Sequence, residues 1–131
     1  MAISNPPARL LSSLCALSAV AALAASAHAA INSGLQIEAG QTFVLGGGQK
    51  GSFAVTGRNT GPVAVEVLGR GEGAAAAQVR GTVAPGGEVD AKFGPGEAAL
   101  LRNTSGREMA RLQLRITGDT SSLGMRYSAN P

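Results

Sequence analysis

Short segments in which apolar and polar residues alternate recur along the chain, and turns rich in glycine and proline separate them. The segment EVDAKF, residues 88–93, shows the pattern most clearly, since its apolar side chains all fall on one face and its charged side chains on the other. It lies between APGG and GPGE, which are both strong turn sequences. A chain made of such segments folds by pairing short strands.

The same period of two predicts strands elsewhere. It is clear in GSFAVTG, PVAVEVLG and LGMRY, and weaker candidates lie at residues 35–38, 42–45, 78–83 and 98–102. Strands that recur about every ten residues are typical of antiparallel sandwiches and barrels. We therefore expect an all-β fold, an antiparallel β-sandwich of immunoglobulin-like or jelly-roll-like type with about eight or nine strands. Its core is expected to contain Phe43, Phe53 and Phe93.

The segment REMARLQLRITG, residues 107–118, carries two conflicting signals. Its composition favours a helix, because Glu, Met, Ala, Arg, Leu and Gln are good helix formers. Its pattern favours a strand, because apolar residues occupy alternate positions from Ala110 to Ile116, whereas a helix would scatter them around its circumference. The pattern extends over eight residues and predicts a strand.

The first 29 residues have the features of a secretory signal peptide. Arg9 precedes a long apolar run, and Ala27 and Ala29 occupy the two small-residue positions of an A-x-A cleavage site. An uncleaved membrane anchor is the alternative, but the run is rich in alanine and serine and only marginally long for a span. We expect a helical signal peptide over residues 1–29, cleavage before Ala30, and one domain over residues 30–131 without a transmembrane segment. The predicted location is the periplasm or the extracellular space.

Cleavage would remove Cys15 and His28, so the mature chain of 102 residues has no cysteine, no histidine and no tryptophan. No disulfide, metal-thiolate site or nucleophile–histidine pair is then available. The mature chain has ten Lys and Arg residues against eight Asp and Glu, an excess too small to indicate nucleic-acid binding. We expect a protein without enzymatic activity, cofactor or metal.

Three motifs have a functional and a plain structural interpretation. Gly69, Gly71 and Ala74 match the spacing of a dinucleotide-binding turn, but a mature chain of this length cannot supply the required parallel sheet. The triplet NTS, residues 103–105, fits a glycosylation acceptor, but the leader looks bacterial, so we interpret the triplet as a turn. Glu88 and Asp90 share a strand face about 7 Å apart, a separation used by sugar hydrolases. Lys92 continues that face, which favours a solvated strand surface.

The sequence predicts a binding or structural module of the bacterial cell envelope, working by strand-edge association with itself or with an envelope protein. An alternative is a small module that binds anionic polysaccharide or lipid head groups. Its candidate residues are Arg111 and Arg115 on one strand face, joined by Arg126 from a strand expected beside them.

Overall fold

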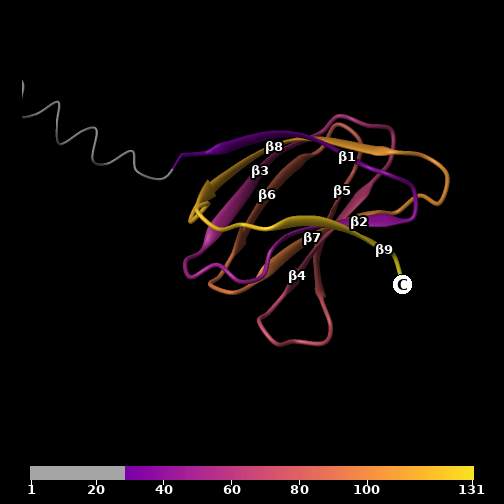
Figure 1. Cartoon of the computed structure of the whole chain (residues 1–131). Coiled ribbons are helices and arrows are strands. Elements are labelled where there is room, and N and C mark those ends of the chain that lie inside the picture. Colours follow the sequence, from indigo (N-terminus) through magenta and orange to yellow (C-terminus); the bar gives the residue numbers. More distant parts are fainter. Residues whose placement is uncertain (1–28) are drawn as a thin grey trace, which may run out of the picture.

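The computed structural model describes residues 29–131, which form two antiparallel sheets packed face to face (Figure 1). One sheet has four strands in the order β1-β8-β3-β6, and the other has five in the order β5-β4-β7-β2-β9. We call them the first and the second sheet. The strands are β1 (Ile31–Ile37), β2 (Gln41–Gly46), β3 (Phe53–Asn59), β4 (Val65–Arg70), β5 (Gln78–Val83), β6 (Glu88–Phe93), β7 (Ala98–Asn103), β8 (Ala110–Gly118) and β9 (Met125–Ala129).

The first eight strands follow the order of a jelly roll. Strands β1, β8, β3 and β6 face β2, β7, β4 and β5. Successive strands therefore lie in opposite sheets, except β4 and β5, which are neighbours in the second sheet. The all-β sandwich expected from the sequence is confirmed, and of the two types considered the jelly roll is the one observed. Strand β9 is added beside β2 at the edge of the second sheet and leads to the C-terminus (Figure 1).

The ambiguous segment at residues 107–118 forms a strand, β8, as its alternation predicts. Strand β8 lies between β1 and β3, and its four alternate apolar residues from Ala110 to Ile116 are all buried. Pairing on both edges and burial of one face outweigh the helical propensity of the individual residues.

The interior lies between the sheets and contains the three phenylalanines expected there. Phe43, Phe53 and Phe93 are each at most 4% exposed. The rings of Phe53 and Phe93 stack with their centroids 5.2 Å apart, which joins β3 to β6 in the first sheet.

Gly57 in β3 is required by the close approach of β8. Its φ is +152°, and a Cβ atom there would lie 2.0 Å from the carbonyl oxygen of Gln113. No side chain fits without separating the two central strands of the first sheet.

Two buried asparagines lie where the chain passes from one sheet to the other, and each bonds two backbone carbonyls there. Asn59 ends β3, and its Nδ2 donates to the carbonyl oxygens of Val63 and Val83 at 2.8 and 3.0 Å. Asn103 ends β7, and its Nδ2 donates to those of Ile37 and Glu108 at 3.0 and 2.8 Å. Both N–H groups of Asn103 are therefore occupied and the residue is 1% exposed, which fits a turn and leaves no room for a glycan.

The expected signal peptide lies almost wholly outside the described residues, and so do Arg9, Cys15, Ala27 and His28. Ala29 and Ala30 are described and lead directly into β1, and the Thr120 hydroxyl donates to the carbonyl oxygen of Ala29 at 3.0 Å. Over residues 29–131 there is no helix of the length and apolar character that a membrane crossing needs.

Candidate functional site

The sandwich has two open sides, and on each side an edge strand of one sheet lies next to an edge strand of the other. Strands β5 and β6 are the edge strands on one side, and β9 and β1 are those on the other. One side chain from the second sheet donates a hydrogen bond across each side to a backbone carbonyl of the first sheet. Arg80 spans the β5/β6 side and Tyr127 spans the β9/β1 side.

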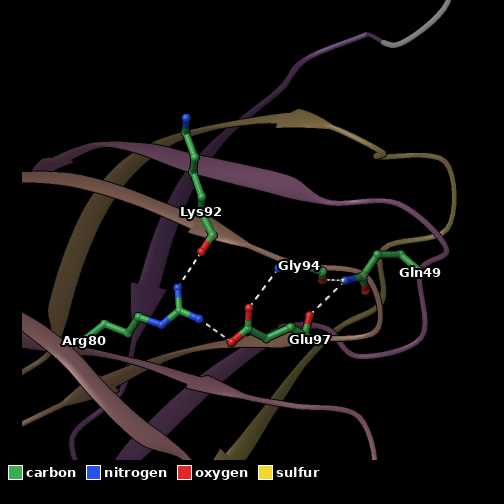
Figure 2. Close-up of polar contacts among 5 residues, drawn as sticks. All are labelled: Gln49, Arg80, Lys92, Gly94 and Glu97. Atoms are coloured by element: carbon green, nitrogen blue, oxygen red, sulfur yellow. Dashed lines mark hydrogen bonds and ion pairs between the residues drawn. The ribbon is translucent and has the colours of Figure 1, made fainter.

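Arg80 is the extra residue of a β-bulge in β5. Val67 pairs with Gly81 and Leu68 pairs with Val79, which leaves Arg80 without a partner on β4. Bulges redirect side chains and interrupt strand edges. The guanidinium extends to β6, where it donates to the Lys92 carbonyl oxygen (Figure 2). It also lies 4.9 Å from the centroid of the Phe93 ring.

Glu97 holds the Arg80 guanidinium in place, and Gln49 anchors the backbone that carries Glu97. Glu97 forms an ion pair with Arg80 and accepts a hydrogen bond from the Gly94 N–H at 2.8 Å (Figure 2). The Gln49 side chain, in a residue only 2% exposed, donates to the carbonyl oxygens of Gly94 and Glu97 at 3.1 and 2.9 Å. The segment GGGQKG, residues 46–51, leads from β2 in the second sheet to β3 in the first and is anchored by Gln49.

The free edge of β6 is charged. The Asn59 N–H bonds to the Gly87 carbonyl oxygen, so the backbone groups of odd-numbered residues point toward β3 and those of Glu88, Asp90 and Lys92 point outward. The side chains of these three residues are exposed, and Arg80 already occupies the Lys92 carbonyl. Charges and a bulge are the usual protection of an edge strand against pairing with another chain.

Tyr127 closes the opposite side more weakly. Its hydroxyl donates to the Gln36 carbonyl oxygen of β1 at 2.9 Å, and its ring lies 5.4 Å from that of Phe43. The residue is 49% exposed, so water reaches this hydrogen bond. No other side-chain hydrogen bond is found between β9 and β1 in the described part of the chain.

The free edge of β9 is regular, and Arg126 is the one charged residue on this strand. The Gly46 N–H bonds to the Gly124 carbonyl and the Asn130 N–H to the Gly40 carbonyl, both at 2.9 Å, so even-numbered residues of β9 point toward β2. The N–H and C=O groups of Met125, Tyr127 and Ala129 therefore point outward. The register with β2 runs without a bulge. Exposed large apolar residues in the described region are Val79, Met125 and Tyr127, so two of the three flank this edge.

The three predicted arginines do not share a face. Arg111 and Arg115 lie on the exposed face of β8 in the first sheet, as the alternation predicts. Arg126 lies on β9 in the second sheet, where it pairs with Val44. The prediction that β9 is a neighbour of β8 is wrong, because β9 pairs with β2 and the two sheets face each other through the core.

Arg58 occupies the place expected of Arg126. It lies on β3 opposite Gln113 of β8, which puts it diagonally next to both Arg111 and Arg115 on the same exposed face. Diagonal neighbours are about 7–8 Å apart, within reach of three guanidiniums on one ligand. Sequence alternation in FAVTGRN points Arg58 outward, but the pairing of β3 with β8 is not visible in the sequence. We call Arg58, Arg111 and Arg115 the arginine face.

Glu88 and Asp90 share the exposed face of β6 as predicted, with Lys92 beside them. They line an open groove of about 430 Å³ between β5 and β6, whose apolar walls include Val83 and Val89. Glu88 lies 3.7 Å from Arg58, in a pair whose side chains are 78% and 63% exposed. Water therefore surrounds these carboxylates. Among residues 29–131 there is no group of three or more His, Cys, Asp or Glu residues placed to hold a metal ion.

Comparison with known proteins adds little to these observations. No protein-family model matches the chain, and no curated protein matches it. Among solved structures, the chain is similar to the Yersinia pseudotuberculosis-derived mitogen (YPM), with 12% sequence identity and a TM-score of 0.43. The match covers 74% of this chain and 95% of that one. At this level of similarity we infer no function from the neighbour.

Proposed function

We propose that this chain is an exported, non-enzymatic binding or structural module of the bacterial cell envelope, and that it associates with protein through the free edge of β9. The observation that carries the proposal is the outward-pointing backbone of Met125, Tyr127 and Ala129. An edge of this kind adds a further strand through main-chain hydrogen bonds, and alternate side chains select the partner.

The contrast with the other edges supports this choice. Strand β5 is interrupted by the Arg80 bulge, and β6 presents charged residues along its edge. Strand β1 is uncharged, but its Gln36 carbonyl already accepts the Tyr127 hydroxyl. Strand β9 combines a regular edge with exposed apolar side chains, and proteins normally avoid leaving such an edge unprotected.

Export is tested by the N-terminal residue of the protein purified from cells that express the full 131-residue chain. Cleavage after Ala29 predicts Ala30 as the first residue, with the protein recovered outside the cytoplasm. The variant Ala27→Arg, which places a large cation in the cleavage site, should leave the leader attached. An intact leader in the unaltered protein would contradict the proposal.

Strand-edge association is tested by site-specific photocrosslinking in the cells that produce the protein. A photoreactive residue in place of Ala129 should give a covalent adduct with another polypeptide, because Ala129 lies at the free edge of β9. The same residue in place of Asp90 is the matched control on β6. The proposal fails if position 129 gives no adduct, or if position 90 gives as much.

The arginine face supports a second candidate function, the binding of an anionic polymer. Arg58, Arg111 and Arg115 gather on one exposed face, and guanidiniums pair with carboxylate and phosphate groups in bidentate geometry. Strand β8 carries two of the three, so the face is built on a central strand with fixed spacing.

Retention on immobilised polygalacturonate, a carboxylated polysaccharide, tests this second function. Binding by the arginine face should weaken with added salt and should be lost when all three arginines are changed to serine. The matched control changes Arg70, Arg107 and Arg126 to serine, which removes the same charge from other parts of the surface. Equal retention of the two triple variants would remove the arginine face from consideration.

A further inference from the structure

We propose that the partner at the β9 edge is a second copy of this chain, paired antiparallel about a two-fold axis at Tyr127. This inference rests on the proposed strand-edge function and specifies its partner. It would join the second sheets of two molecules into one continuous sheet of ten strands, since each contributes five.

The direction of the backbone groups fixes which pairings are allowed. Met125, Tyr127 and Ala129 point outward, so in an antiparallel pair these residues must lie opposite outward-pointing residues of the second copy. With the axis at Tyr127, Met125 faces Ala129 of the other copy and Tyr127 faces its own equivalent. All three outward residues are then paired, giving about six main-chain hydrogen bonds across the interface.

Charge and strand length together favour this register over the two registers shifted by two residues. With the axis at Tyr127, Arg126 lies opposite Ser128 of the other copy, so the register places no like charges opposite each other. Moving the register two residues toward the start of β9 places Arg126 opposite its own equivalent, which is unfavourable. Moving it two residues the other way leaves Met125 without a partner. Only the register with the axis at Tyr127 pairs all three outward residues and places no like charges opposite each other.

The side chains fit the same arrangement. Met125 and Tyr127 are 46% and 49% exposed and lie on one face of β9, so each copy brings an apolar pair to the interface. Pairing covers them with Ala129 and Tyr127 of the second copy. The Tyr127 hydroxyl remains bonded to the Gln36 carbonyl of its own β1, because the pairing uses only the backbone of β9.

Sedimentation equilibrium of the full-length gene product, purified from cells over a range of concentrations up to about 1 mM, measures the dimerisation directly. We expect a reversible monomer–dimer equilibrium. Ser128→Arg should weaken dimerisation about tenfold or more, because two pairs of like charges then face each other across the axis. Adding Arg126→Glu to this variant should restore dimerisation, because each pair becomes opposite in charge.

Ser121→Arg, in the exposed turn before β9, is the matched control and should leave the equilibrium unchanged. Thermal unfolding of each variant shows whether the fold is kept, and the restoring double variant tests the register even if Ser128→Arg lowers stability. A protein that stays monomeric at every concentration, or a dimer insensitive to Ser128→Arg, would overturn the inference. If position 129 still crosslinks to a different protein in cells, strand-edge association survives with another partner; if it does not, both proposals fail.

Discussion

Each open side of this sandwich is closed by one side chain of the second sheet that bonds a backbone carbonyl of the first sheet, and the two closures differ in strength. On the β5/β6 side, Arg80 comes from a bulge, bonds a β6 carbonyl, contacts the Phe93 ring and is held by Glu97. On the β9/β1 side, Tyr127 provides a single hydroxyl that water can reach. The first side carries several charges and a bulge, whereas the second is regular and has Arg126 as its one charged residue. A jelly roll must leave edge strands, and this chain protects one pair of them and leaves β9 open.

The largest loss of folding stability is expected when Arg80, the side chain that closes the β5/β6 side, is replaced. Arg80→Met keeps an apolar stem over Phe93 but removes the donors to the Lys92 carbonyl and to Glu97. We expect a loss of about 1–2 kcal/mol in the free energy of unfolding, reduced by solvent because the arginine side chain is 37% exposed. Chemical denaturation measures this loss. A change below a few tenths of a kcal/mol would show that Arg80 does not close the β5/β6 side.

A smaller effect is expected from Glu97→Gln. The amide oxygen can still accept from the Gly94 N–H, but the amide NH2 then faces Arg80, so both the charge and the acceptor that orient Arg80 are lost. We expect a loss of about 0.5–1 kcal/mol, and less than that when Arg80 is already replaced by Met, because the two side chains act together. Equal losses in the two backgrounds would contradict this coupling.

The smallest effect is expected from Tyr127→Phe on the opposite side. The ring contact with Phe43 remains and only the exposed hydroxyl is removed, so we expect about 0.5 kcal/mol or less. Its effect should add to that of Arg80→Met in the double variant, because the two residues lie on opposite sides and share no partner. A Tyr127→Phe loss as large as that of Arg80→Met would show that the two closures are equally strong.

Much of the fold follows from local pattern. Alternation, with the turn sequences that flank residues 88–93, predicts the boundaries of β6 and β8 within a residue and puts Phe43, Phe53 and Phe93 in the core. Residues close in sequence are enough to show which face of a strand is buried. Strand order depends on contacts between distant segments, and no periodicity records it. For this reason Arg126 is predicted beside Arg115 and found in the other sheet, whereas Arg58 goes unnoticed in the sequence.

The roles of Arg80 and Tyr127 in closing the two sides could not be predicted from the sequence for a related reason. Arg80 acts through a bulge, which adds one residue to a strand that otherwise looks ordinary, and its partners lie 12 and 17 residues away. Tyr127 bonds a carbonyl 91 residues away in the chain. Gln49 stands in a glycine-rich segment, and only its backbone partners Gly94 and Glu97, between β6 and β7, explain why it is buried.

Amide hydrogen exchange measured residue by residue at low and at high protein concentration tests most directly whether β9 is the edge that associates. The amides of Met125, Tyr127 and Ala129 should exchange more slowly as concentration rises, because each becomes a donor to the added strand. Those of Glu88 and Asp90, which point outward from the protected edge of β6, should exchange at the same rate throughout. Slowing at β6, or no slowing at β9 under conditions where the protein associates, would contradict the account.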